Sequence, residues 1–171
     1  MATTFTRFRS PVGELVLAAT ESGITGVYFP TSRYGPAPLD RNDWVEDDGR
    51  GPASALLAQA RRQLEGYFAG SRTTFDLPLS PAGTPFQRRV WDALRAIPYG
   101  TTLSYSELAR RLGDLRATRA VGAANGRNPI PIIVPCHRVV GANGALTGFG
   151  GGLDCKRWLL EHEGALMMLG G

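Results

Sequence analysis

The chain contains the run Ile130-Pro131-Ile132-Ile133-Val134-Pro135-Cys136-His137-Arg138, in which a cysteine and a histidine stand side by side after an apolar stretch. A thiol is a nucleophile only as the thiolate, and an adjacent imidazole is one of the few groups that accept its proton near neutral pH. The apolar stretch predicts that Cys136 and His137 lie at the mouth of a buried pocket. Taken alone, these residues also fit an inert core cysteine, because a free cysteine usually packs as a small hydrophobe.

The residues before this run predict helices separated by glycine turns. Thr84 caps the first helix, and Ser104 with Glu107 predicts a reciprocal capping box at the start of the second. The second helix is predicted to end at Gly113, and a third to cover residues 116–125. A helix, a glycine turn and another helix are the outline of a helix-turn-helix motif, which places its second helix in a groove of DNA.

The last of these predicted helices has an unusual composition for a DNA reader. Residues 117–125 are mostly small, and only Arg119 and the following Arg127 have long side chains. Reading bases in the major groove requires several long polar side chains. The composition therefore predicts a close approach to a narrow or shallow groove without sequence preference, with tight packing of two helices inside the protein as the alternative.

The first half of the chain predicts a small sheet with one helix. Strands are predicted at residues 5–10, 14–20, 24–29 and 74–77, and a helix at residues 53–69. Residues 30–52 are rich in Pro, Gly and Asp and predict a long irregular loop. Nothing in this half suggests catalysis, so we interpret it as a scaffold. The segment 80–83, Ser-Pro-Ala-Gly, predicts a linker that divides the chain into domains 1–82 and 83–171.

The composition is that of a soluble globular protein, with 43% hydrophobic and 20% charged residues among 171. No apolar stretch reaches the length of a membrane span, and the N-terminus lacks an apolar signal core, so we expect a cytoplasmic protein with no membrane contact. The net charge is uneven. Residues 1–82 carry 8 Arg and 9 acidic residues, which is a net charge of −1. Residues 83–171 carry a net charge of +5, and the two halves together give the total of +4. This asymmetry predicts an anionic partner for the second half, or only a solvated basic surface.

The cysteines and histidines do not have the spacing of a metal site. Cys136 is adjacent to His137, whereas Cys155 and His162 lie further along the chain, so we predict neither a zinc site nor a disulfide framework. Cys155 has no role that we can assign from the sequence.

Taken together, the motifs of the second half resemble the O6-alkylguanine-DNA alkyltransferase family, in the family's order. The motifs are Ser104-Tyr105, Arg119-Ala120-Val121-Gly122, the run from Asn128 to Val134, Pro135-Cys136-His137-Arg138, Gly150-Gly151-Gly152-Leu153 and the closing segment Trp158-Leu159-Leu160-Glu161-His162-Glu163-Gly164. The first half resembles the family only in its general organisation, as a small scaffold with a sheet and a helix. The resemblance implies an α/β + α fold: a ribonuclease H-like roll, with a small β-sheet and a helix, followed by a winged-helix-like domain that carries the helix-turn-helix.

The resemblance also implies a reaction. The family transfers an alkyl group from O6-alkylguanine in DNA irreversibly to a cysteine, here Cys136, and O4-alkylthymine is a second candidate substrate. His137 would take the thiol proton through a water, and Glu163 would orient His137. Asn128 would brace the turn before the strand that leads to the cysteine. No cofactor is implied, and each molecule would act once, because a thioether is not hydrolysed.

The same resemblance implies how double-stranded DNA is bound. The helix would lie in the minor groove, and Arg119 would enter the stack in place of a flipped base. The other residues implied to contact DNA are Thr118, Ala120, Gly122 and Arg127. We expect a monomer in solution, with cooperative assembly on DNA left open.

Further residues are implied to form the substrate pocket. Tyr105 would push the nucleotide and donate a hydrogen bond, and the carbonyls of Cys136 and Val139 would accept from the guanine amino group. The Gly150 amide would donate to the exocyclic oxygen. Phe149 would cover the pocket, although family members commonly have Tyr there, so a hydroxyl is missing.

Three other functions compete with this interpretation. A non-catalytic lesion sensor of the same family would lack the reactive cysteine, which is present here. A helix-turn-helix transcription regulator would bind a specific DNA sequence and would not need Cys136. A cysteine hydrolase would turn over acyl substrates and would not need Arg119.

Overall fold

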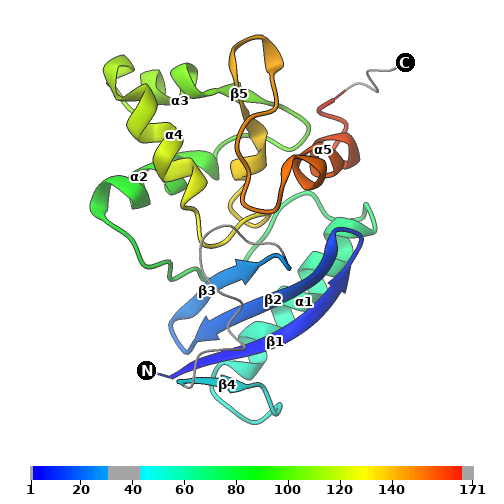
Figure 1. Ribbon diagram of the computed structural model, residues 1–171. Coiled ribbons are helices and arrows are strands. Elements are labelled where there is room, and N and C mark those ends of the chain that lie inside the picture. Colours follow the sequence, from blue (N-terminus) through cyan, green and yellow to red (C-terminus); the bar gives the residue numbers. More distant parts are fainter. Residues whose placement is uncertain (1, 31–42, 167–171) are drawn as a thin grey trace. The chain divides into compact units, whose positions relative to one another are not determined.

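The computed structural model describes residues 2–30 and 43–166, which belong to two compact units, Met1–Ala82 and Gly83–Gly171 (Figure 1). In the first unit, the sheet strands follow the order β3-β2-β1-β4. The strands are β1 (Thr3–Ser10), β2 (Gly13–Thr20), β3 (Gly23–Tyr28) and β4 (Trp44–Glu46). Strand β2 is antiparallel to both β1 and β3, and β4 is parallel to β1.

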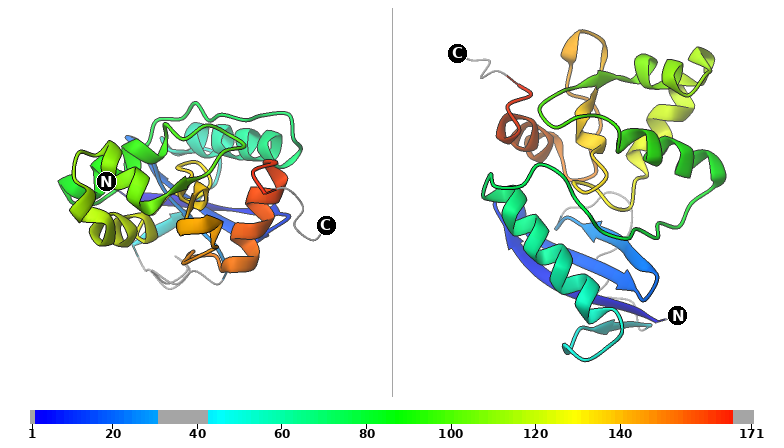
Figure 2. Two further views of the ribbon diagram at one scale, coloured as in Figure 1. Left: turned by 90° about the horizontal axis from the view of Figure 1, so that it is seen from above. Right: turned by 180° about the vertical axis from the view of Figure 1, so that it is seen from behind.

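Helix α1 (Ser54–Phe68) packs on this sheet and closes the core of the first unit (Figure 2). Leu57, Ala60 and Leu64 recur at helical spacing on its buried face, and none of their surface is exposed. From the sheet, Leu15, Leu17 and Ile24 are equally buried. The predictions of three strands and one helix in this half are confirmed, with boundaries within two residues.

Two predictions for the first half were wrong. Trp44–Glu46, inside the predicted loop 30–52, forms strand β4 on the edge of the sheet; residues 31–42 of that loop lie outside the described residues. Three residues are too few to show a periodic pattern. The predicted strand 74–77 is absent, because the side chain of Gln63 takes the place of a partner strand. Its amide donates to the Asp76 carbonyl and accepts from the Asp76 N–H, both at 2.9 Å.

The second unit is built from short helices. They are α2 (Pro85–Leu94), α3 (Tyr105–Arg111), α4 (Thr118–Gly126) and α5 (Leu153–His162), with the 3-10 helices η2 (Leu115–Ala117), η3 (Cys136–Arg138) and η4 (Ala142–Gly144). Helices α3 and α4 pack together through η2, as a helix-turn-helix predicts. Gly113 follows α3 with φ +92°, a backbone conformation that glycine adopts without strain.

The helix caps agree with the predictions, except that the Glu107 side chain does not take part. The Thr84 hydroxyl caps α2 by accepting from the Gln87 N–H, and the Gln87 side-chain oxygen accepts from the Thr84 N–H. The Ser104 hydroxyl likewise accepts from the Glu107 N–H at 3.1 Å. The Glu107 carboxylate does not complete the predicted box, because it pairs with Arg110 at 3.0 Å.

The apolar run before Cys136 is a buried turn rather than the strand that the family resemblance implies. The Val134 N–H donates to the Ile130 carbonyl at 2.9 Å, and Ile132 has a positive φ of 72°. The Asn128 side chain bonds both ends of this turn, donating to the Val134 carbonyl at 2.8 Å and accepting from the Ile130 N–H at 3.0 Å. The prolines in this run carry no N–H for a strand ladder, which explains why the apolar pattern does not form a strand.

A parallel strand pair links the turn to the helix-turn-helix. Strand β5 (Leu103–Ser104) pairs with β6 (Val139–Val140), with Leu103 opposite Val139. Because β5 immediately precedes Tyr105 and β6 immediately follows η3, this pairing brings Tyr105 near the Cys136 segment. No helix in the described parts of the chain is long and apolar enough to span a membrane.

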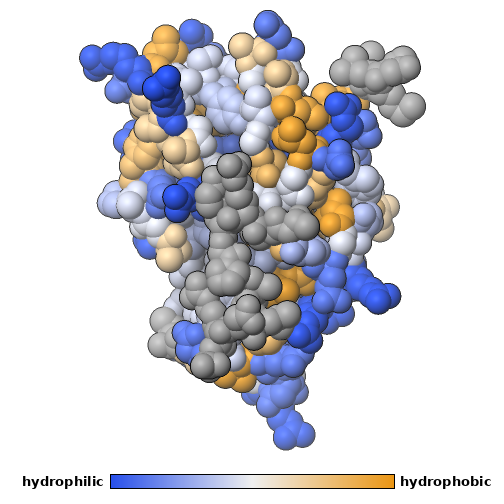
Figure 3. All heavy atoms as spheres, viewed as in Figure 1, coloured by the Kyte–Doolittle hydropathy of each residue, from blue (hydrophilic) through white to orange (hydrophobic). Residues whose placement is uncertain are grey.

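The surface of the second unit has an apolar hollow of about 390 Å³ beside α5. Its apolar lining includes Leu146, Leu153 and Leu166, and hydrophobic residues gather over α5 and the loop before it in Figure 3. Asp154 and Arg157 also line the hollow. The lining includes no cysteine or histidine, so the hollow has no thiol nucleophile and no imidazole base.

Candidate active site

Cys136 begins η3 and is buried, with 5% of its surface exposed. Burial raises the pKa of its thiol to about 11, while a hydrogen bond with Asn128 and the positive charge of Lys156 act in the opposite direction. The resting cysteine is therefore a thiol at neutral pH. An attack by sulfur requires a base that removes the proton at the site.

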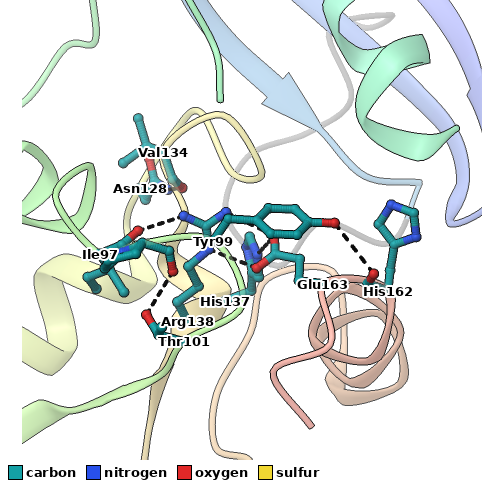
Figure 4. Close-up of polar contacts among 10 residues, drawn as sticks. Ile97, Tyr99, Thr101, Asn128, Val134, His137, Arg138, His162 and Glu163 are labelled. Atoms are coloured by element: carbon teal, nitrogen blue, oxygen red, sulfur yellow. Dashed lines mark hydrogen bonds and ion pairs between the residues drawn. The ribbon is translucent and has the colours of Figure 1, made fainter. Parts of the chain in front are cut away.

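His137 has the geometry of such a base. Its side chain is fully buried, and Nε2 lies 2.7 Å from Oε2 of Glu163 (Figure 4). Burial lowers the pKa of His137, although Glu163 opposes this effect, so the imidazole is neutral at neutral pH. Since Nε2 faces a carboxylate, we assign the hydrogen to Nε2. Nδ1 is buried, has no hydrogen-bond partner among the described residues and keeps its lone pair.

Glu163 is held by a residue that the sequence interpretation left without a role. Arg138 donates from Nε to Oε1 at 2.8 Å and from Nη2 to Oε2 at 3.1 Å, and its Nη1 donates to the Ile97 carbonyl at 2.7 Å (Figure 4). Its side chain is 7% exposed, and that of Glu163 is fully buried. Arg138 was visible within the run that carries Cys136 and His137, but its partner lies 25 residues away.

Lys156 is a second site residue that the sequence interpretation missed. It is fully buried, and its Nζ donates to the carbonyls of Val139 and Thr147, each at 2.7 Å. Burial lowers the pKa of Lys156 to about 8, while the proximity of Cys136 raises it. A usable signal existed, because this is the only lysine in a chain whose other basic residues are all arginine.

The predicted carbonyl acceptors already have donors in this structure. Val139 accepts from Lys156, and the Cys136 carbonyl accepts from the buried Asn125 side chain at 3.4 Å. The Cys136 carbonyl also accepts from the Val139 N–H at the end of η3, so both of its lone pairs are engaged. Their contact with guanine stays a prediction.

The loop between η4 and α5 lies beside the start of α3. The Tyr105 hydroxyl donates to the Thr147 carbonyl at 3.5 Å and accepts from the Thr147 hydroxyl at 3.0 Å. Phe149 and Gly150 are half-buried in the same loop. Through the bond from Lys156 to Thr147, this loop is tied to the cluster around Cys136.

The predicted DNA-binding residues lie on or at the end of α4. Arg119, Ala120 and Arg127 are exposed, whereas Thr118 and Gly122 are half-buried. A Cβ at position 122 would lie 3.6 Å from the Tyr105 ring, which is an ordinary van der Waals contact, so the spacing between α4 and Tyr105 would also accommodate an alanine.

The opposite face of α4 is anchored inside the unit. Val121 and Ala124 are buried, and the indole N–H of Trp91 donates to the Ala124 carbonyl at 2.8 Å.

Cys155 is a half-buried free thiol on α5. Among the described residues, no three Cys, His, Asp or Glu side chains are close enough together to hold a metal ion.

Comparisons with known proteins cover nearly the whole chain. Residues 4–81 match the model of the 6-O-methylguanine DNA methyltransferase ribonuclease-like domain, and residues 85–165 match that of its DNA binding domain. A methylated-DNA–protein-cysteine methyltransferase of Methanosarcina acetivorans is 50% identical over 92% of this chain and 96% of its own length. The constitutive enzyme of that name from Bacillus subtilis is 45% identical over 93% and 94%. The crystal structure of Mycobacterium tuberculosis OGT in complex with DNA has a TM-score of 0.83 and 48% identity, covering 94% of this chain and 92% of that one.

Proposed function

The chain belongs to the 6-O-methylguanine DNA methyltransferase family, and we propose that it repairs DNA by transferring the alkyl group of O6-alkylguanine to Cys136. The observation that carries this assignment is a buried cysteine followed by a neutral histidine, whose Nε2 faces Glu163 and whose Nδ1 keeps its lone pair. This is the arrangement of nucleophile, base and orienting carboxylate that activates a thiol.

The reaction follows from the protonation states. His137 Nδ1 accepts the thiol proton through a water, and the resulting imidazolium is stabilised by the Glu163 carboxylate. The Cys136 sulfur attacks the alkyl carbon, so that a C–S bond forms while the bond from carbon to O6 breaks. The electron pair of the broken bond goes to the guanine, where the Tyr105 hydroxyl donates a hydrogen bond to the developing charge.

The thioether product explains why each molecule acts once. Neither His137 nor Glu163 can serve as a second nucleophile toward an S-alkyl carbon, and a thioether is a poor leaving group. The proposed reaction needs no cofactor. We place it in the cytoplasm, where DNA and a reducing environment occur together.

The proposed partner is double-stranded DNA bound by α4 through the minor groove. The exposed Arg119 would fill the space of the flipped nucleotide, and the small residues Ala120 and Gly122 would allow the helix to approach the backbone closely. Thr118 and Arg127 would contact the DNA on either side of Arg119. The pocket would then close over the base with Phe149 and the Gly150 amide, while the carbonyls of Cys136 and Val139 accept from the guanine.

Intact-mass spectrometry after incubation with a duplex that carries one O6-methylguanine tests this proposal. We expect a gain of one methylene group, stopping at one per molecule and located on Cys136 by peptide mapping. Cys155→Ser is the matched control, because it removes the other thiol of the chain and should leave the gain unchanged. No gain with selective binding to the lesion would identify a sensor. No gain without lesion preference would favour a DNA-binding regulator.

A further inference from the structure

Arg138 and Lys156 are charged side chains of the cluster that the proposed reaction does not use, and of these two Arg138 contacts Glu163. Its guanidinium donates three hydrogen bonds away from its own segment, two to Glu163 and one to the Ile97 carbonyl beyond the end of α2. Its guanidinium also lies 5.6 Å from the centre of the Tyr99 ring (Figure 4). Because the buried guanidinium is hydrogen-bonded at three points, Arg138 is held in one orientation, and its positive charge acts on the groups beside it.

One carboxylate oxygen joins Arg138 to the base. Oε2 of Glu163 accepts from Nη2 of Arg138 at 3.1 Å and lies 2.7 Å from Nε2 of His137. An ionised Glu163 carboxylate accepts from both neighbours through this oxygen. If Glu163 carried a proton, it could donate to Nε2 of His137, and the imidazole hydrogen would then sit on Nδ1.

We propose that Arg138 is a positioning residue that keeps one proton off the Glu163–His137 pair, so that Nδ1 of His137 can accept the proton of Cys136. The inference rests on the proposed alkyl transfer for its effect on rate. Its effect on the state of His137 is independent of that reaction.

The charges around the pair support this role. The positive charges of Arg138 and Lys156 both lower the pKa of His137, after burial as the largest cause, and Glu163 raises it. Lys156 binds the carbonyls of Val139 and Thr147 instead of the carboxylate. The pKa of Tyr99 and that of Cys136 are both raised, so these groups are uncharged near neutral pH. Without Arg138, the buried carboxylate would lose its paired cation and the pair would take up a proton.

The rate of Cys136 alkylation by a free O6-alkylguanine base, measured from about pH 6 to about pH 9, separates this role from a merely structural one. For Arg138→Met we expect at least a tenfold loss at pH 7 that is recovered as the pH rises by one unit or more, since tenfold corresponds to one pKa unit. Arg138→Lys keeps the charge and should restore the wild-type pH profile. A loss that is equal at every pH, or no loss, would overturn the proposal.

A second variant and a matched control guard against misfolding. Arg138→Met combined with Glu163→Gln leaves neither charge unpaired, and it should be no slower than Glu163→Gln alone, because Arg138 acts through Glu163. Further slowing in that background would contradict the proposal. Arg157→Met removes an arginine from an exposed pair with Glu161 on α5 and should leave the profile unchanged.

Nitrogen NMR of the imidazoles decides the inference even if no alkyl transfer occurs. The chain has two histidines, so His162→Gln assigns the signals. We expect a neutral ring with hydrogen on Nε2 in the wild type and a ring with hydrogen on Nδ1 in Arg138→Met at neutral pH. An unchanged ring would overturn the role of Arg138, whereas failure of the wild type to gain an alkyl group would overturn only the proposed function.

Discussion

The buried cluster around Cys136 and the exposed face of α4 have different functions within one unit, and these functions need opposite environments. In the cluster, Glu163, Arg138 and Lys156 are buried with paired charges or satisfied hydrogen bonds, because an unpaired charge away from water is costly. On α4, Arg119 is exposed beside small residues. A base that must accept a proton needs a protected environment, whereas a surface that binds a phosphate backbone must be open. Variants should therefore separate chemistry from binding.

The largest effect should come from Cys136→Ser. We expect this variant to lose alkyl transfer completely, because a hydroxyl is far harder to ionise than a thiol, and to keep its affinity for DNA, because α4 is untouched. Mass spectrometry and a binding titration on one duplex measure the two properties. Transfer by this variant would remove Cys136 as the nucleophile, and lost binding would show that the two regions are not separable.

Arg119→Ala should have the converse effect. Base flipping costs a few kcal/mol, so loss of the side chain that fills the vacated space should slow repair of a duplex by about 10- to 100-fold. The reaction with a free alkylated base should change by less than about twofold, because that substrate needs no flipping. Single-turnover rates on both substrates test this. Equal slowing would argue that Arg119 supports the cluster instead of replacing a base.

Alkylation itself should destabilise the cluster. Cys136 is 5% exposed in a packed turn, and forcing an added group into such a site typically costs about 1–3 kcal/mol. Denaturant unfolding of the protein before and after reaction measures the loss, with Cys136→Ser as the control that cannot react. An unchanged or higher midpoint for the alkylated protein would mean that the site has room for the alkyl group.

The smallest predicted effect is a pH dependence of stability from His137. Its pKa is lowered in the folded protein, so below the ordinary value of about 6.5 the unfolded chain binds more protons than the folded one. The free energy of unfolding should fall as pH drops from 7 to 5, by at most about 1.4 kcal/mol per pH unit from this residue. His137→Gln should flatten the fall relative to wild type, and His162→Gln should not. The same slope in all three proteins would contradict a buried neutral His137.

Several elements were predictable because their signals are local. The caps Thr84 and Ser104 and the turn at Gly113 depend on neighbouring residues, and the structure confirms all three. The capping box at Glu107 was wrong because a competing arginine lies within one helical turn. Similarly, the resemblance implied a strand leading to Cys136, whereas the prolines of this run and Asn128 favour a hydrogen-bonded turn.

The sequence by itself determined the candidate nucleophile and base, the helix-turn-helix and the family resemblance, because each depends on residue types at short, readable spacing. The tertiary structure decided the partners of Arg138 and Lys156, the edge strand β4 and the pairing of β5 with β6. These contacts join residues that are distant along the chain. Burial then sets the ionisation of Cys136 and His137, and burial depends on how the whole unit packs rather than on any local pattern.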